Sequence, residues 1–130
     1  MPDDCPRVVV VDDSTDVRVL VAAVLDHDGF HVVADVSTAE EALIAVDIYA
    51  PEIVLVDQRL ESELGTDLLA QLRRSSDAVL VLLTAHVSES VRSTARECGA
   101  DAIVDKAETM RLPDRLRELL AAREELAPIA

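Results

Sequence analysis

The sequence is poor in cysteine and glycine and has no long hydrophobic run, and each shortage excludes a class of protein. Its two cysteines, Cys5 and Cys98, are too few for a disulfide framework and too far apart for a metal–thiolate site. Its three glycines, Gly29, Gly65 and Gly99, form no Gly-x-Gly-x-x-Gly loop, which argues against a dinucleotide-binding fold. No apolar run reaches the roughly 18 residues of a membrane-spanning helix. Acidic residues also stand at the start, where a signal peptide carries positive charge, so we expect a cytoplasmic protein.

Positive charge is scarce as well. The chain has 12 Lys and Arg against 26 Asp and Glu, a formal net charge of −14, which argues against nucleic acid or an anionic membrane as its partner. Lys106 is the only lysine, which suggests a role for its ammonium group, with chance as the alternative. A length of 130 residues with 50% hydrophobic residues is typical of one domain with one substantial core.

Five short runs rich in β-branched residues alternate with helical patterns. The strand starts recur about every 23 residues, the length of one strand, one helix and two loops, which predicts five βα units. Three of the runs are apolar almost throughout, so we expect a parallel sheet with helices on both faces. No linker is evident, and we expect one domain over residues 1–126 with a tail at 127–130. The predicted strands are residues 7–11, 31–36, 53–56, 79–83 and 102–104.

Cap and stop residues place the five helices. The first is expected to begin after Ser14 and end at Gly29, the second to follow Ser37 or Thr38 and stop before Pro51. The other three are expected near Thr66, from Ser88 to Cys98, and from about Pro113. Spacing of i, i+3, i+4, i+7 and i+8 predicts that the first helix buries Val17, Leu20, Val21, Val24 and Leu25.

Unusual polar residues follow four of the predicted strands. Each alone has an ordinary explanation as a helix cap, a turn residue or a solvated side chain. Together they occupy equivalent positions, and open parallel sheets bind ligands at the carboxyl ends of their strands. We therefore favour a functional site made of Asp12, Asp13, Asp57, Thr84 and Lys106.

Three neighbouring carboxylates repel one another, because two unit charges 4 Å apart cost about 4 kcal/mol at an effective dielectric of 20. A proton or a cation must balance this cluster. Ligands that are all oxygen favour a hard ion such as Mg²⁺ over zinc. A metal-bound acid beside a lysine and a hydroxyl suits phosphoryl chemistry, in which Asp57 attacks phosphorus to form an acyl phosphate.

In the order and spacing of these residues the chain resembles the CheY-like receiver domains of two-component response regulators. The match covers nearly the whole chain: an Asp pair after the first strand, an Asp ending the third, Thr84-Ala85 after the fourth and Lys106 after the fifth, with Gly65 eight residues beyond Asp57. The resemblance implies an α/β fold, a flavodoxin-like (βα)5 three-layer sandwich with a parallel sheet of order 2-1-3-4-5.

The resemblance also implies a role for each site residue. Asp57 would be the phosphoacceptor and, with Asp13, a direct magnesium ligand. Asp12 would bind Mg²⁺ through water, and the backbone carbonyl of Arg59 would complete the set. Lys106 would pair with the phosphoryl group. After switching, the Thr84 hydroxyl would hydrogen-bond the same group.

The implied partner is a histidine kinase or a phosphotransfer protein. The chain would be a signalling protein rather than an enzyme, although it would assist its own phosphorylation and dephosphorylation. It would act through an unidentified downstream protein, as a monomer or weak dimer.

Three positions depart from the family's usual pattern. Glu61 stands where a proline often follows the phosphoacceptor. Ala107 replaces the proline after Lys106, so we expect a trans peptide bond there, since a cis bond before a non-proline residue costs roughly 3 kcal/mol. Ile103 occupies the position of the aromatic switch residue, so we expect altered or weak coupling to the face formed by the fourth helix, fifth strand and fifth helix.

Two further residues are expected to tune the lifetime of the acyl phosphate. Arg59 and His86 lie two residues beyond Asp57 and Thr84, beside the path of the hydrolytic water in the family. One hypothesis is that Arg59 slows hydrolysis; the alternative is that it pairs with Glu61 or Glu63 on the surface.

Two other functions compete with that of a phosphoacceptor. A degenerate receiver would bind a partner regardless of phosphorylation, as the missing prolines and Ile103 suggest, but the complete set of site residues speaks against it. A haloacid dehalogenase-type phosphatase also uses Asp, Thr and Lys. It requires an acid two residues after the nucleophile, where this chain has Arg59.

Overall fold

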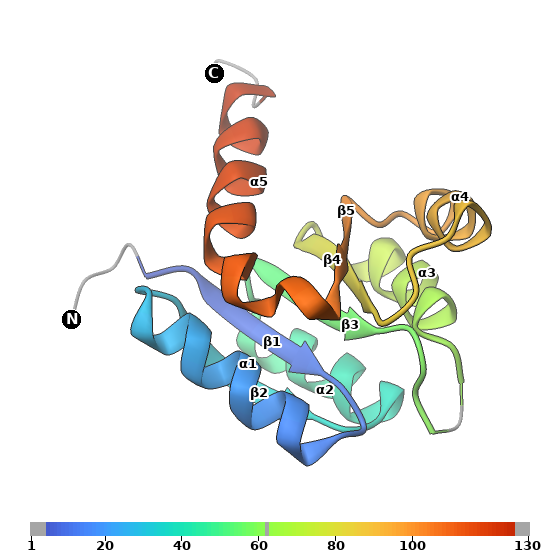
Figure 1. The fold of residues 1–130 in the computed structure, drawn as a ribbon, viewed down its shortest axis with the longest axis horizontal. Coiled ribbons are helices and arrows are strands. Elements are labelled where there is room, and N and C mark those ends of the chain that lie inside the picture. Colours follow the sequence, from blue (N-terminus) through green and yellow to red (C-terminus); the bar gives the residue numbers. More distant parts are fainter. Residues whose placement is uncertain (1–4, 62, 127–130) are drawn as a thin grey trace.

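The computed structural model describes residues 5–61 and 63–126, so the predicted tail at 127–130 lies outside the described residues. Five parallel strands form one sheet of order β2-β1-β3-β4-β5, which confirms the predicted fold (Figure 1). No helix in the described ranges is both long enough and apolar enough to cross a membrane. The elements are β1 (Arg7–Val11), α1 (Thr15–His27), β2 (His31–Val36), α2 (Ala39–Tyr49), β3 (Ile53–Asp57), α3 (Gly65–Ser75), β4 (Val79–Thr84), α4 (Glu89–Glu97), β5 (Ala102–Asp105), the 3₁₀ helix η1 (Lys106–Arg111) and α5 (Leu112–Leu126).

Helices cover both faces of the sheet. Because successive side chains of a strand point to opposite faces, β1 sends Val9 and Val11 into one core and Val8 and Val10 into the other. The first core is closed by α2, α3 and α4, and the second by α1 and α5. Strands β1, β3 and β4 are buried almost completely, which explains their continuous apolar sequences.

Side-chain caps fix the starts of three helices. Ser14, Thr38 and Ser88 each accept a hydrogen bond from the backbone N–H three residues later. Thr38 is therefore the cap of α2, which settles the choice between Ser37 and Thr38. The last residue of β3 is Asp57 itself, one residue beyond the predicted end.

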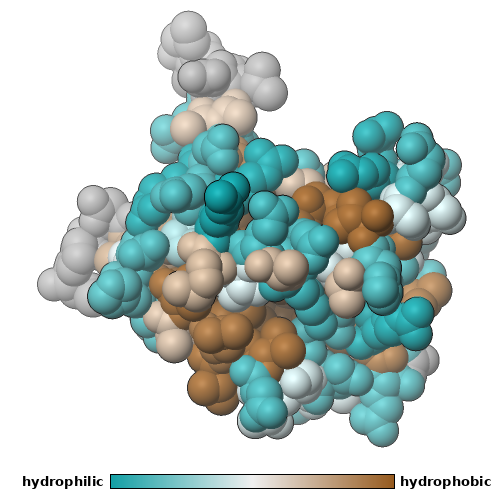
Figure 2. Space-filling view, viewed as in Figure 1, coloured by the Kyte–Doolittle hydropathy of each residue, from teal (hydrophilic) through white to brown (hydrophobic). Residues whose placement is uncertain are grey.

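The predicted inward face of α1 is too wide. Val21 and Leu25 are fully buried, but Leu20 is 50% exposed. Neighbouring residues lie about 100° apart around a helix, and the sheet covers only the stripe centred on Val21 and Leu25. Val19 is 64% exposed beside Leu20, and the space-filling view shows an apolar area over α1 (Figure 2).

The end of α2 is held by a residue of β1. The Arg7 guanidinium donates hydrogen bonds to the carbonyls of Tyr49 and Ala50 and lies 3.4 Å from a Glu52 carboxylate oxygen. Cations at a helix C-terminus interact favourably with its dipole and its last carbonyls. Ala50 has φ +43°, a left-handed conformation that favours glycine.

Candidate functional site

The predicted site residues meet at one edge of the sheet. Asp12 follows β1, Asp57 ends β3, Thr84 ends β4, and Lys106 begins η1 after β5. The strands are parallel, so their carboxyl ends share an edge. Carboxylate oxygens of Asp12, Asp13 and Asp57 all lie within 4.8 Å of one another. The spatial grouping inferred from the sequence is therefore present.

Lys106 bridges two of these carboxylates. Its Nζ lies 3.0 Å from Asp12 Oδ2 and 2.9 Å from Asp57 Oδ1. The described residues contain no cis peptide bond, as expected for the bond between Lys106 and Ala107. The missing proline therefore does not keep the lysine away from the site.

The electrostatics of the site follow from burial. Asp57 is 5% exposed, and this burial, with the charge of Asp12, raises its pKa above the ordinary value, although Lys106 acts in the opposite direction. For Lys106, burial lowers the pKa, but the hydrogen bond to Asp57 and the charges of Asp57 and Asp12 outweigh it, so the net shift is upward. Lys106 stays charged. One ammonium group thus faces three carboxylates, which leaves the site with excess negative charge.

The residues present fit a hard divalent cation. Asp12 is fully buried; its Oδ1 accepts a hydrogen bond from the Ser14 N–H at 2.9 Å. Its Oδ2 is an ion-pair partner of Lys106 but accepts no hydrogen bond of normal geometry from any described residue. A buried oxygen with spare acceptor capacity, beside two more carboxylates, is the donor set that Mg²⁺ prefers. Asp13 is exposed and borders the open side of the site.

Thr84 is buried at the end of β4, 5% exposed. Its hydroxyl donates a hydrogen bond to the His86 carbonyl at 3.3 Å and accepts one from the His86 N–H at 3.2 Å. The hydroxyl is therefore held within the turn between β4 and α4 in this structure.

Hydrogen bonds to Gln58 anchor the start of α3 beside Asp57 without the family's proline. The Gly65 N–H donates to the Gln58 carbonyl at 2.8 Å, and the Thr66 N–H donates to the Gln58 side chain at 3.2 Å. A Cβ on Gly65 would lie only 2.2 Å from the carbonyl oxygen of Asp57, so only glycine fits. Sequence reasoning missed Gln58, whose only signal was a polar side chain directly after a strand end.

An open cleft of about 620 Å³ lies over the carboxylates. Arg59 and His86 line it and are exposed, while Asp57, Thr84 and Lys106 lie deeper. Neither Glu61 nor Glu63 lies within ion-pair distance of Arg59, so the surface pairing considered for Arg59 is not found among the described residues. All the described ion pairs are formed by Arg7, Arg18, Arg73, Lys106 and Arg117.

Ile103 does not line this cleft. It is partly buried on β5 and borders separate hollows beside α4 and α5. A hollow of similar size, about 630 Å³, lies between the ends of α2 and α3. Its lining residues lie near the amino ends of β3 and β4, at the end of the sheet opposite the carboxylates. They include no carboxylate cluster of the kind that holds a metal.

The family model of the response regulator receiver domain matches residues 8–120. The chain is 34% identical over 128 residues to the transcriptional regulatory protein AruR of Pseudomonas aeruginosa, covering 93% of this chain and 49% of that protein. It is 26% identical over 132 residues to the transcriptional regulatory protein PdtaR of Mycobacterium tuberculosis, covering 95% and 64%. The chain thus spans about half to two thirds of the length of these curated relatives.

A solved structure shows the same architecture. The CheY-like response regulator receiver domain protein of Methanospirillum hungatei JF-1 superposes with a TM-score of 0.85 at 23% identity, covering 95% of this chain and all of that one. The strand order β2-β1-β3-β4-β5 is the order that the sequence resemblance implies, and the family model covers residues 8–120. The chain belongs to the response regulator receiver domain family.

Proposed function

We propose that this receiver accepts a phosphoryl group on Asp57 from a histidine kinase or a phosphotransfer protein, in a reaction that requires Mg²⁺. The geometry around Asp57 carries the proposal. Its carboxylate ends a central strand, borders the open cleft and contacts the lysine ammonium at 2.9 Å, with two further carboxylates nearby. The phosphorylated domain signals by changed binding to another protein.

The proposed step is an in-line displacement at phosphorus. An Asp57 carboxylate oxygen forms the new O–P bond while the bond from phosphorus to the donor's histidine nitrogen breaks. Asp12, Asp13 and Asp57 would hold the metal, together with the Arg59 carbonyl. When bound, Mg²⁺ neutralises the oxygens of the incoming group. Lys106 lies where it can pair with those oxygens.

Two residues act after the transfer. The Thr84 hydroxyl is proposed to leave its hydrogen bonds with the His86 backbone and bond to the phosphoryl group. Arg59, at the rim of the cleft with His86, is proposed to slow hydrolysis by pairing with phosphoryl oxygens. An Arg59→Asn variant should then lose the phosphoryl group faster than the wild type; an unchanged rate would contradict this role.

The receiver that binds its partner regardless of phosphorylation is less favoured. A decayed site would lose its acidic residues and its lysine first, yet Lys106 contacts Asp12 and Asp57, and Asp13 has a carboxylate oxygen within 4.8 Å of theirs. The cytoplasmic location and a monomeric or weakly dimeric state stay predictions.

The experiment is intact mass spectrometry after incubation with acetyl phosphate and Mg²⁺. We expect a gain of one phosphoryl group, absent in the Asp57→Asn variant and in EDTA. Asp105→Asn is the matched control, because it changes the carboxylate at the end of β5, which lies outside the metal-binding group, and this variant should still be phosphorylated. If neither acetyl phosphate nor a candidate histidine kinase phosphorylates the chain, the phosphoacceptor function is refuted.

A further inference from the structure

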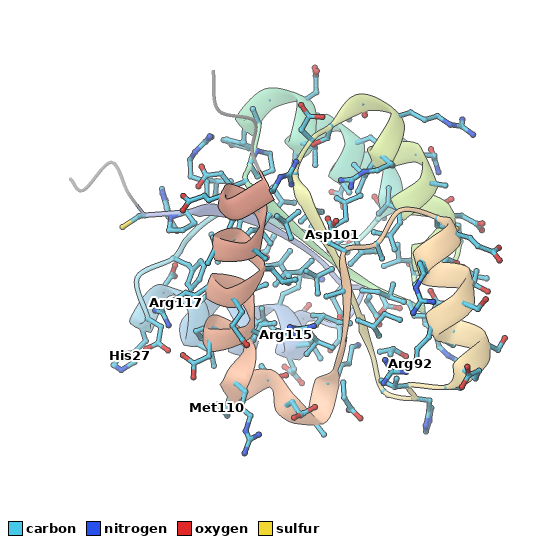
Figure 3. The ribbon with its side chains drawn as sticks, turned by 90° about the horizontal axis from the view of Figure 1, so that it is seen from above. His27, Arg92, Asp101, Met110, Arg115 and Arg117 are labelled. Carbon is cyan, nitrogen blue, oxygen red and sulfur yellow. The ribbon has the colours of Figure 1, made fainter. Side chains whose placement is uncertain are left out.

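A short 3₁₀ helix carries the lysine of the site. Lys106 is the first residue of η1, which Figure 3 shows as the bend between β5 and α5. The last pair in the ladder between β4 and β5 is Thr84 with Asp105. Lys106 is therefore the first residue after β5 that strand pairing does not hold, and its backbone position depends on η1.

The Lys106 side chain has to cross a strand to reach its partners. Its ammonium lies 3.0 Å from Asp12, after β1, and 2.9 Å from Asp57, at the end of β3. Strand β4 stands between β3 and β5 in the sheet. Neighbouring strands are about 4.8 Å apart, so β3 and β5 are separated by roughly 10 Å. A stem of four carbons leaves little slack over this distance, so a small outward shift of the Lys106 backbone breaks both contacts.

Side chains hold both polar groups of the peptide unit that follows Lys106. The Ala107 N–H donates a hydrogen bond to Asp105 Oδ1 at 2.8 Å, and the Lys106 carbonyl accepts one from the Thr109 hydroxyl at 2.7 Å. Because a peptide unit is planar, fixing its N–H and its C=O fixes the orientation of the whole unit. The direction in which the Lys106 side chain leaves the backbone is fixed with it.

The two residues that hold this peptide unit are themselves anchored. Asp105 is the last residue of β5 and belongs to the sheet. Thr109 is 9% exposed, and its carbonyl accepts a hydrogen bond from the N–H of Leu112, which is fully buried in the core closed by α1 and α5. The peptide unit after Lys106 is thus fastened to the sheet through one side chain and to the core through the other.

This arrangement requires a residue with an N–H at position 107. A proline there would have no N–H to donate to Asp105. It would also disfavour the helical backbone that Lys106 adopts in η1, because proline restricts the residue before it. Ala107 meets both requirements, so the sequence after Lys106 fits the two hydrogen bonds that the structure shows.

We propose that Asp105 and Thr109 are positioning residues for phosphoryl transfer, which hold the peptide unit after Lys106 so that its ammonium reaches the carboxylates of the site. Neither residue lines the cleft over these carboxylates, so both act through the backbone of Lys106. The inference rests on the proposed function, in which Lys106 pairs with the oxygens of the incoming phosphoryl group.

The test compares variants that lose one of the two hydrogen bonds with variants that keep it. Asp105→Ala removes the acceptor and Thr109→Val removes the donor. Each should slow phosphorylation by acetyl phosphate and Mg²⁺ about five- to tenfold, because misplacing a group that acts on the reacting atoms slows the transfer. Asp105→Asn and Thr109→Ser keep an acceptor oxygen and a hydroxyl, and should restore the wild-type rate. Glu108→Gln is the matched control, since it changes an exposed acid of η1 that forms neither bond.

A second readout follows Lys106 without any phosphorylation. Lys106 is the only lysine, so ¹⁵N-labelled lysine gives a single ammonium signal in NMR spectra. Exchange of the ammonium protons with water is slowed by ion pairs such as those with Asp12 and Asp57. Asp105→Ala and Thr109→Val should speed this exchange severalfold, while Asp105→Asn should leave it unchanged. Urea unfolding of each variant confirms that it is folded under the assay conditions.

Three results would overturn the proposal. These are wild-type rates in both Asp105→Ala and Thr109→Val, equal slowing by the variants that keep the hydrogen bonds, and slower phosphorylation without faster ammonium exchange. The last result would show a purely structural role. Failure of the proposed function looks different: no chain, including the wild type, is phosphorylated, yet ammonium exchange still separates the variants that lose a bond from those that keep it.

Discussion

Replacing Gly65 by alanine is expected to damage the phosphoacceptor from the backbone side, without touching any group that faces the cleft. The new Cβ would stand 2.2 Å from the Asp57 carbonyl oxygen and 2.9 Å from its carbonyl carbon. Real Cβ atoms essentially never come closer than 3.0 Å to another heavy atom. The helix start and the end of β3 must therefore separate by close to 1 Å, since neither contact is with a flexible side chain.

This separation has two measurable costs. Overpacking of this kind lowers the free energy of unfolding by about 1–3 kcal/mol. The hydrogen bonds from the Gly65 and Thr66 N–H groups to Gln58 lengthen as well, so the Asp57 carboxylate loses its fixed position. A displacement of about 1 Å at a reacting group costs up to roughly 100-fold in rate, so we expect phosphorylation by acetyl phosphate to slow by ten- to 100-fold.

The matched control is Gly29→Ala. Gly29 has φ +90°, so alanine is strained there at about 1–2 kcal/mol, but a Cβ would meet nothing within 4 Å, and the residue lies between α1 and β2. Urea unfolding measures the stability of both variants, and intact mass against time measures phosphorylation. If Gly65→Ala is phosphorylated as fast as Gly29→Ala, the close contact with the Asp57 backbone does not position the carboxylate, and the reasoning fails.

Three further variants test individual contacts. Asp57→Asn should raise the free energy of unfolding at pH 7 in EDTA, because the fold raises the pKa of Asp57. This gain in stability should shrink as the pH falls through the raised pKa towards the ordinary value near 3.8. Urea unfolding at a series of pH values measures the gain. Ala50→Gly should stabilise the chain by about 1 kcal/mol in urea unfolding, since φ +43° strains alanine; a loss of stability would contradict this. Glu41→Gln should destabilise the chain at neutral pH, because the backbone N–H and hydroxyl of Ser37 and the Thr38 hydroxyl lower the pKa of Glu41. The difference in unfolding free energy from the wild type should be present above pH 4.5 and disappear as the pH falls below it. A difference that does not depend on pH would refute the charge effect.

Much of the fold can be predicted from the sequence, because the features that mark strands and helix starts involve residues close together in the chain. β-branched runs bounded by polar residues mark strands, and Ser14 and Ser88 mark helix starts by the hydrogen bonds that only such side chains make. Continuous apolar strands imply burial on both faces, which implies parallel pairing. Parallel pairing then places the ends of four strands, and with them Asp12, Asp57 and Lys106, at one edge.

Local patterns failed where burial depends on the neighbouring element. Leu20 fits the apolar period of α1 as well as Val21 does, yet only Val21 is covered by the sheet. The spacing of apolar residues predicts which of them share one side of the helix. The shape of the element packed against that side decides how many of them are buried. The N-cap of α2 could not be assigned between Ser37 and Thr38 for a similar reason. Either hydroxyl can accept the capping hydrogen bond, and the backbone conformation before the helix makes Thr38 the cap.

The number, type and order of the elements and the residue types at the site can be predicted from the chain alone, because they follow from hydrogen-bonding capacity and side-chain period along it. Distances between strands become known from the folded chain: one Lys106 ammonium contacts both Asp12 and Asp57, and Gly65 lies against the Asp57 carbonyl. Electrostatic energies and steric limits depend on separations through space. Those separations are set by packing between segments far apart in the sequence.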